Sequence, residues 1–275
     1  SSGIKSYPTA NYVNYYGMQN GYPINDMTKA DAESGYDPTH PWKNRDPRFY
    51  KTIMFDGVKW RNTGGAGGTA ELFTGGRESE EANEKKGCFT AYMNSKLCPQ
   101  LMNTFDGYKE NNIMILSLMR LADVYLMYAE ATAVGYNSPK GKAATYSLTA
   151  EEALNKIRER AGVAPVLEKF LGSTADFLSE LRRERAVELS FEGFRFTDLR
   201  RWMLLTQYPY TLKTKIEFDR ADPNNYNYDA PEENAIKNLR EVVLIERKYT
   251  DRHYWYPLPK KDVSMYEGFY QNPGW

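Results

Sequence analysis

The sequence predicts a mainly α-helical protein, in which tetratricopeptide-like helical hairpins support a loop-rich subdomain that contains short β-strands. Residues 113–205 place apolar side chains three and four positions apart, which is the spacing of amphipathic helices. Residues 1–112 are instead interrupted every few positions by Gly, Pro, Asn and Asp, a pattern typical of turns and loops. Residues 206–275 are again irregular. We expect these three regions to form one domain of 275 residues.

The composition is that of a folded globular protein that carries no net charge. Lys plus Arg and Asp plus Glu both number 36, so no overall field attracts nucleic acid or an anionic membrane surface. The 22 Tyr residues outnumber the 12 Phe and 5 Trp residues. Tyr offers a flat apolar face and a hydroxyl that needs a partner, so the population favours a surface that grips polar ligands. Any single Tyr is explained equally well as a residue that lines the rim of a loop-rich core.

No segment is predicted to span a membrane or to direct secretion. The most apolar stretch, residues 113–121, is far shorter than the roughly 20 residues that a spanning helix needs, and it contains Ser117 and Arg120. The first five residues contain neither an apolar run nor a cleavage site. We therefore expect the chain to begin inside a longer protein.

In the first region we expect a β-hairpin and one further strand. Residues 49–55 predict a strand that closes with the turn signal Asp56-Gly57. Residues 58–60 return as its hairpin partner. Residues 88–93 are a second strand candidate, and the glycine-rich residues 63–68 predict a flexible loop.

The second region predicts a pair of antiparallel helices. The first runs to Gly135, and its spacing defines an apolar face expected to pack on a core: Leu121, Val124, Tyr125, Tyr128 and Ala131. The second begins with a capping box of Thr149 and Glu152 and ends at Gly162. Two such helices form a hairpin of the tetratricopeptide kind, which needs further helices to cover its apolar face.

Two more helices and an irregular tail complete the prediction. Residues 174–192 predict a helix whose first residue caps it and which Gly193 closes. Residues 196–205 predict the next helix. Residues 222–234 are rich in Asn, Asp and Pro and predict a loop. Residues 242–245 predict either a short buried strand or the inner face of one more helix.

The two cysteines carry little information. Cys88 and Cys98 lie ten residues apart, which is roughly 33 Å in a straight strand, so they can pair only if the chain turns back between them. We expect two free, buried thiols, with a disulfide as the alternative.

Little in the sequence supports catalysis by a metal or an activated nucleophile. Neither His40 nor His253 has a second His or Cys at ligand spacing. No Gly-x-Ser-x-Gly nucleophile elbow occurs. The glycine run at residues 64–68 lacks the Lys-Ser/Thr that completes a phosphate-binding loop. We expect neither a cofactor nor a metal.

A pair of carboxylates needs separate consideration, because two are enough for a glycosidase. Glu184 and Glu188 lie one helical turn apart, with Glu192 one turn further. Neighbouring guanidinium groups keep such carboxylates ionised, whereas a general acid needs a raised pKa. We therefore favour a salt-bridge lattice that pins the third predicted helix to the fourth over an active site. The arginines expected in it are Arg182, Arg183, Arg185, Arg195, Arg200 and Arg201.

Four motifs, in order along the chain, resemble the SusD/RagB family of outer-membrane nutrient-binding lipoproteins. The run LRRERAVELSFEGFRFTDLRRW, residues 181–202, is similar to the signature helix-turn-helix of that family. Residues 120–131 resemble the helix before it, and residues 45–50 resemble the segment before the variable ligand loops. The ending, residues 256–259 and 271–275, is similar to the carboxy-terminal end of the family. The resemblance spans the chain but covers only the carboxy-terminal portion of a family member.

The resemblance implies a SusD-like fold without its amino-terminal helices, in which residues 1–112 face the ligand and residues 113–205 form the scaffold. It implies an outward-facing protein on the Gram-negative outer membrane, held there by a lipidated cysteine that this chain lacks. It implies a TonB-dependent SusC-like porin as partner and a role in polysaccharide utilisation. The implied ligand is a glycan, or a peptide as in RagB-like members, and it is bound without catalysis.

Aromatic and amide side chains in the loops are the expected ligand contacts. Sugar rings stack their apolar C–H faces on aromatic planes, while their hydroxyls need polar partners. The residues that we expect to bind the ligand are Tyr36, Trp42, Trp60, Asn62, Phe73, Tyr92, Asn94 and Tyr108. Trp42 and Trp60 are explained equally well as core residues, and Trp202 is assigned to the core because it shares an apolar side with its neighbours.

Overall fold

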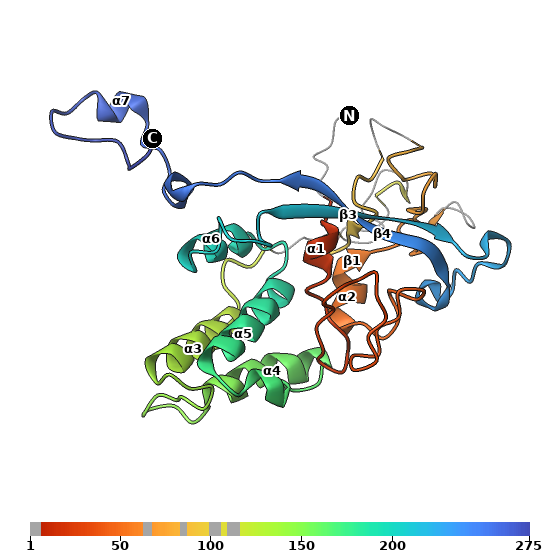
Figure 1. Ribbon diagram of the computed structural model, residues 1–275, viewed down its shortest axis with the longest axis horizontal. Coiled ribbons are helices and arrows are strands. Elements are labelled where there is room, and N and C mark those ends of the chain that lie inside the picture. Colours follow the sequence, from red (N-terminus) through yellow and green to blue (C-terminus); the bar gives the residue numbers. More distant parts are fainter. Residues whose placement is uncertain (1–6, 63–67, 83–86, 99–105, 109–115) are drawn as a thin grey trace.

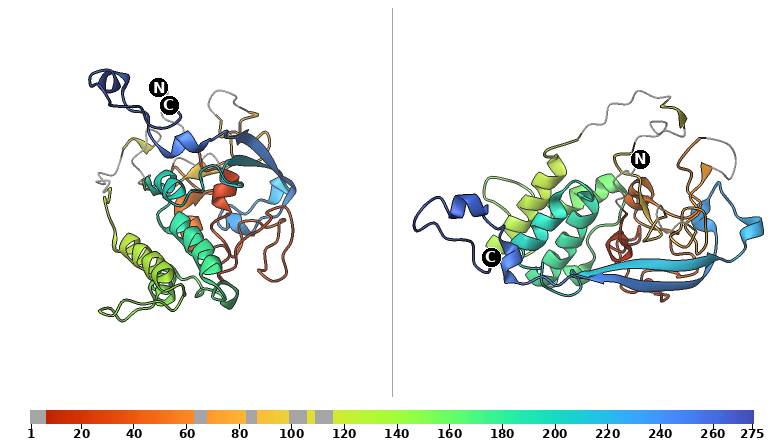
Figure 2. Two further views of the ribbon diagram at one scale, coloured as in Figure 1. Left: turned by 60° about the vertical axis from the view of Figure 1, so that its left-hand side comes forward. Right: turned by 90° about the horizontal axis from the view of Figure 1, so that it is seen from above.

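The computed structural model describes residues 7–62, 68–82, 87–98, 106–108 and 116–275. Figure 1 shows a bundle of helices on one side, a loop-rich half on the other, and a long β-hairpin that extends along both. The view from above in Figure 2 shows the same arrangement. The prediction of a mainly helical fold with short strands is confirmed. In the described part of the chain, no helix is long and apolar enough to cross a membrane.

The helices are α1 (Ala10–Val13), α2 (Pro47–Thr52), α3 (Leu121–Gly135), α4 (Ala150–Ala161), α5 (Thr174–Glu188), α6 (Phe194–Arg201) and α7 (Lys260–Val263). The strands are β1 (Ile53–Met54), β2 (Met93–Asn94), β3 (Leu212–Arg220) and β4 (Ile236–Glu246). Short 3₁₀ turns lie between some of them: η3 (Glu168–Phe170), η4 (Pro223–Asn225), η5 (Pro231–Glu233) and η6 (Asp251–Tyr254).

The helical half forms around small residues of α3. Ala122, Ala129 and Ala133 are buried with Leu126, and they pack on buried residues of α4 and α5. The apolar face that the sequence predicts for α3 is only partly correct: Tyr125 and Tyr128 pack against this core, but Leu121 and Val124 are 66% and 42% exposed. Small side chains let the helices approach closely, and Leu126 fills the space between them.

The ends of α4 follow the sequence signals. Thr149 accepts a hydrogen bond from the backbone N–H of Glu152, whose side chain accepts one from the N–H of Thr149. Gly162 ends the helix with a left-handed φ of 73°, which glycine adopts without strain. The predicted capping box and the predicted glycine stop are both confirmed.

The next two helices are shorter than predicted. Ser173 caps α5 by accepting from the N–H of Asp176, and the helix ends at Glu188, four residues before the predicted end. Phe191 has a φ of 60°, so the helix cannot continue to residue 192. Gly193 then precedes α6 rather than closing α5, and α6 ends at Arg201.

The predicted strand at residues 49–55 is largely wrong, because most of it belongs to α2. Asp46 accepts a hydrogen bond from the N–H of Arg48 at 2.9 Å, and Pro47 occupies the first turn. An N-cap and a proline at this position start a helix and outweigh the strand-like composition that follows. Helical packing also buries Phe49 completely.

Only two residues of that segment are extended. Ile53 and Met54 form β1 and pair with β2, so the strand predicted for residues 88–93 is limited to its last residue. Residues 58–60 do not return along β1. Lys59 instead bridges to Thr69, and the predicted hairpin is therefore wrong.

The third region contains the longest strands, where the sequence predicts an irregular segment. β3 and β4 pair antiparallel, with register shifts after Lys213 and after Glu217. Residues 242–245 lie in β4, so the strand alternative is correct, but Val243 and Ile245 are exposed rather than buried. The predicted loop at residues 222–234 joins the two strands.

Residues 247–275 leave the body as an arm that folds back on itself (Figure 1). The side-chain amide of Gln271 bonds to both backbone groups of Leu258, at 2.7 and 2.9 Å. The indole N–H of Trp275 donates to the carbonyl of Arg252 at 2.9 Å. These bonds give the arm a defined shape.

Both cysteines are free. Cys88 is buried, but Cys98 is exposed, so the expectation of two buried thiols is correct only for Cys88.

Candidate functional site

Three of the eight residues predicted to bind a ligand are core residues, and the prediction is wrong for them. Tyr36, Trp42 and Tyr92 are 3%, 0% and 0% exposed. Trp42 stacks on Phe55 at 4.9 Å and meets the ring of Phe218 at 5.2 Å. The hydroxyls are also engaged: that of Tyr36 donates to a backbone carbonyl, and that of Tyr92 accepts from the indole of Trp42. A sugar cannot reach these rings.

Three others lie together at the surface. The backbone N–H of Asn62 donates to the carboxylate of Asp106 at 2.8 Å, which brings residues 106–108 beside residues 60–62. Tyr108 is 64% exposed and Asn62 is exposed, while Trp60 is half-buried. The guanidinium of Arg61 lies 4.8 Å from the Trp60 ring. We call Trp60, Asn62 and Tyr108 the loop cluster.

The last two predicted residues take part in local structure. Phe73 is half-buried, with the guanidinium of Arg220 at 4.5 Å from its ring. That guanidinium is also bound by the buried carboxylate of Asp56, at 2.7 and 3.0 Å. The carboxamide of Asn94 accepts from the N–H of Lys96 and donates to its carbonyl, both at 3.0 Å. A role of Phe73 and Asn94 in ligand contact stays a prediction.

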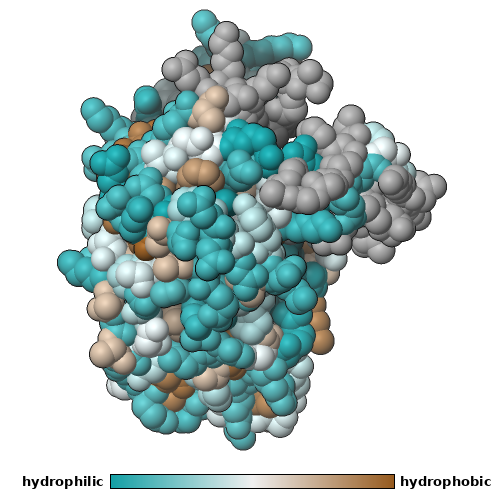
Figure 3. Space-filling view, turned by 90° about the vertical axis from the view of Figure 1, so that its right-hand side faces the viewer, coloured by the Kyte–Doolittle hydropathy of each residue, from teal (hydrophilic) through white to brown (hydrophobic). Residues whose placement is uncertain are grey.

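The surface around the loops is polar. Figure 3 faces the side of the molecule that carries the loops and the tip of the β-hairpin, and hydrophilic residues dominate it, with apolar residues in small patches between them. Such a surface favours polar ligands with small apolar faces over extended apolar partners.

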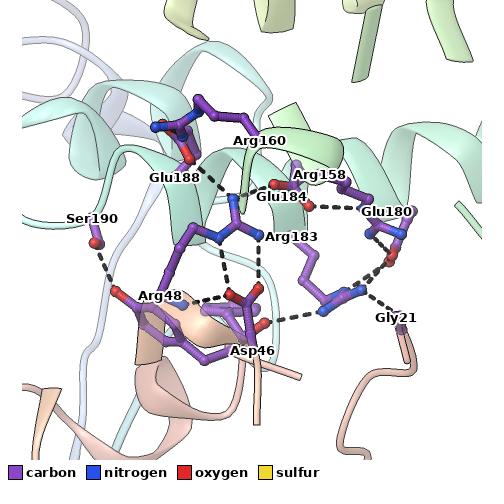
Figure 4. Close-up of polar contacts among 12 residues, drawn as sticks. Gly21, Asp46, Arg48, Arg158, Arg160, Glu180, Arg183, Glu184, Glu188 and Ser190 are labelled. Atoms are coloured by element: carbon purple, nitrogen blue, oxygen red, sulfur yellow. Dashed lines mark hydrogen bonds and ion pairs between the residues drawn. The ribbon is translucent and has the colours of Figure 1, made fainter. Parts of the chain in front are cut away.

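Glu184 and Glu188 of α5 are both matched by cations, as the sequence predicts, although the partners differ. Glu184 binds Arg48 of α2 at 2.5 Å and Arg158 of α4 at 2.9 Å. Glu188 binds Arg48 at 3.0 Å and Arg160 at 2.6 Å. Figure 4 shows these side chains converging between α2, α4 and α5. The lattice therefore joins α5 mainly to α2 and α4.

The link from α5 to α6 passes through a different residue. Arg185 binds Asp198 of α6 at 2.7 Å and also contacts Asp123 of α3. Trp202, assigned to the core from the sequence, is only half-buried, and its indole N–H donates to Glu130 at 2.7 Å. The predicted salt-bridge link between α5 and α6 exists, but Arg185 and Asp198 form it rather than Glu184 or Glu188.

The electrostatics of the lattice oppose acid–base catalysis. Burial by itself raises the pKa of Glu184, but the guanidinium groups of Arg48 and Arg158 outweigh it and lower that pKa to about 2. The pKa of Glu192 is also lowered, because Arg120 and Lys96 outweigh its partial burial. A carboxylate held ionised in this way cannot deliver a proton near neutral pH.

A cleft of about 590 Å³ opens beside the lattice, between α2, the turn after β2, the start of α3 and the end of α5. Lys51, Lys96 and Arg160 line it together with the apolar side chains of Leu118 and Phe191. Its two acidic residues, Glu188 and Glu192, are paired with cations. The cleft can hold a polar or anionic group against an apolar wall. The sequence does not reveal it, because its residues come from five separate segments, one of them α4.

No group of three or more potential metal ligands occurs in the part of the chain that the structure describes. His40 binds the nearby carboxylate of Asp37 at 3.0 Å. His253 bonds to Thr250 and packs against the ring of Trp275 at 5.7 Å. Both histidines therefore have local structural roles.

A comparison with sequence models of protein families identifies one family. The sequence model of the SusD family matches residues 1–275. A SusD-like protein from Bacteroides fragilis NCTC 9343 has a similar structure, with a TM-score of 0.67 and 22% identity, over 98% of this chain and 47% of that one. A SusD superfamily protein from Bacteroides vulgatus ATCC 8482 matches with a TM-score of 0.43 and 21% identity, over 73% of this chain and 34% of that one. No curated protein matches the sequence. The chain thus spans about half the length of the first structure.

Proposed function

The chain belongs to the SusD family, and on that premise we propose that it contributes to the capture of glycans at the cell surface, without altering them chemically. The observation that carries this proposal is the loop cluster, where the bond from Asn62 to Asp106 joins the segment of an exposed Tyr ring to the segment of a half-buried Trp ring and an amide. Rings stack on the C–H faces of sugars, and the amide pairs with their hydroxyls.

The small number of rings in the loop cluster suits a transport role. One or two stacking rings supply little binding free energy. Because each tenfold decrease in dissociation constant needs about 1.4 kcal/mol, the resulting affinity is modest. A modest affinity lets the protein release its ligand to a partner. We propose that this partner is a TonB-dependent SusC-like porin in the outer membrane, and that a lipid anchor outside this chain holds the protein on the outer face.

The absence of catalysis is supported by the charge lattice. Glu184 and Glu188 are the tempting pair for a glycosidase, yet each is bound by two or more guanidinium groups. A general acid of a glycosidase needs a raised pKa, whereas that of Glu184 is lowered. If purified protein released reducing sugar, and if Glu184→Gln or Glu188→Gln abolished that release, the non-catalytic proposal would be wrong.

The binding test is a titration of the protein against a panel of soluble polysaccharides by calorimetry. We expect at least one glycan to bind, and Tyr108→Ala to weaken that binding by about tenfold through loss of one stacking platform. The matched control is Tyr136→Ala, which removes another exposed Tyr, at the end of α3 on the helical half. Equal effects of the two substitutions would contradict a site at the loop cluster.

A peptide ligand is the alternative, because some relatives implied by the sequence resemblance bind peptides. Mass spectrometry of the protein purified from its native membrane distinguishes the two. Peptides that co-purify and are released on denaturation, together with no glycan bound in the titrations, would replace the glycan proposal with the peptide one.

A further inference from the structure

Two cations share one face of the β3–β4 hairpin. Lys213 of β3 pairs in register with Ile245 of β4. Two residues further on, the N–H of Arg247 donates to the carbonyl of Thr211 at 3.0 Å, which continues the pairing. Because side chains alternate between faces, Lys213 and Arg247 are diagonal neighbours on the same face.

A third cation joins them from the start of α6. The guanidinium of Arg195 packs over the rings of Tyr15 and Tyr210, at 4.8 and 5.6 Å. Its Nη1 atom is buried and has no hydrogen-bond partner in the described part of the chain. A buried N–H without an acceptor is costly, so the packing around Arg195 leaves part of its guanidinium uncompensated. We call Arg195, Lys213 and Arg247 the cation triad.

The charges of the triad are not balanced by the described residues. None of the three forms an ion pair there, and the nearest acid on α6, Asp198, is taken by Arg185 and Arg201 at 2.7 and 2.9 Å. Glu246 adjoins Arg247 in sequence but pairs with Leu212 in register, on the opposite face of the hairpin. Like charges gathered without a counter-charge raise the free energy of the folded protein.

Lys215, the next lysine of β3, has the counter-charge that Lys213 lacks among the described residues. Lys215 is bound by Glu217 at 2.7 Å and by Glu80 at 3.4 Å, so its charge is compensated. Burial, together with the neighbouring charges of Arg247 and Arg195, lowers the pKa of Lys213 to about 8. Lys96 and Arg160 of the cleft are also paired, with Glu192 and Glu188. The triad thus differs from these compensated cations.

We propose that the cation triad binds the acidic groups of a charged glycan, either the carboxylates of uronic acids or sulfate esters. Guanidinium and ammonium groups bind both oxyanions through charge-assisted hydrogen bonds. A polymer with an acidic group on many of its sugar units supplies several negative charges to three adjacent cations, which a neutral glycan cannot do. This inference rests on the proposed function and names the class of glycan.

The test compares acidic and neutral polysaccharides on the same protein. Polygalacturonate supplies carboxylates, chondroitin sulfate supplies sulfate esters as well, and dextran is neutral. Calorimetry at low and high sodium chloride is expected to show salt-sensitive binding of at least one acidic polymer. Lys213→Gln is expected to weaken it about tenfold, and the matched control Lys215→Gln is expected to leave it unchanged.

A second measurement does not depend on a glycan. Sodium sulfate is expected to raise the Tm of the parent protein above its value in sodium chloride of equal ionic strength, and to raise that of Lys213→Gln less. Lys213→Gln itself is expected to fold and to melt no lower than the parent, because it removes a repulsion. If it does not fold, the exposed Arg247→Gln replaces it in both measurements.

The outcomes separate this inference from the proposed function. Equal losses in Lys213→Gln and Lys215→Gln, or acidic polymers that bind no better than dextran, would overturn the triad as a binding site. If neutral glycans from the wider panel still bind, the proposed function stands without the triad. If no polysaccharide of any charge binds, the proposed function fails as well.

Discussion

The Nε atom of Arg158 lies 2.9 Å from a carboxylate oxygen of Glu184, and both side chains are almost completely buried. Arg158 belongs to α4 and Glu184 to α5, so one buried ion pair joins the two helices. Arg48 of α2 binds the other oxygen of the same carboxylate. Glu184 therefore connects the helical half of the molecule to the loop-rich half.

Removing this charge should destabilise the protein strongly. Glu184→Gln leaves two guanidinium groups with a neutral partner, and breaking a buried pair in this way costs about 3–5 kcal/mol. Urea denaturation gives the change in the free energy of unfolding. The control is Glu159→Gln, which removes the exposed pair with Lys156 and should cost no more than about 0.5 kcal/mol. Similar losses in both variants would show that the lattice does not stabilise the fold.

The same carboxylate predicts how stability depends on pH. The pKa of Glu184 is about 2 in the folded protein, against an ordinary value of 4.5. A lowered pKa contributes stability that is complete above pH 4.5 and is lost as the pH falls toward 2. The contribution is on the order of 3 kcal/mol. Denaturation curves between neutral and acidic pH should show this loss, and Glu184→Gln should show less of it. Parallel pH profiles for the two proteins would contradict the assignment.

The sequence predicts best where the signal is local. The capping box of Thr149 and Glu152 and the stop at Gly162 lie within a few residues of the ends that they set, and α4 forms as predicted. The same kind of signal was available for α2, where Asp46 and Pro47 mark a helix start. Strand-like composition in the residues that follow obscured it.

The buried faces depend on contacts that are distant in sequence. Apolar residues occur around most of α3, so spacing alone does not show that Ala129 and Leu126 face the core while Leu121 does not. Trp42 is buried because Phe218, more than 170 positions away in the chain, packs against it. No local pattern contains that information. The partners of Glu184 were missed for the same reason.

The two tryptophans of the predicted site should therefore respond differently to truncation. Trp42→Ala removes a fully buried ring that stacks on Phe55, and it should lower the free energy of unfolding by about 3–5 kcal/mol. Trp60→Ala removes a half-buried ring of the loop cluster and should cost less stability, but it should weaken glycan binding. Denaturation and calorimetry on both variants separate the roles. If Trp60→Ala cost as much stability as Trp42→Ala and left binding intact, Trp60 would be a core residue.

The cysteines offer a test of the fold that needs no ligand. Burial raises the pKa of both thiols, but Cys88 is sealed in the core whereas Cys98 is exposed. A thiol reagent reaches the thiolate of an exposed cysteine and not that of a buried one. In the native protein, a chromogenic disulfide reagent should therefore label Cys98 slowly and leave Cys88 unmodified until denaturant is added. Cys98→Ser should abolish labelling of the native protein, and Cys88→Ser should not change it. Rapid native labelling of two thiols would contradict the buried position of Cys88, and a reaction that requires prior reduction would show that the two are paired.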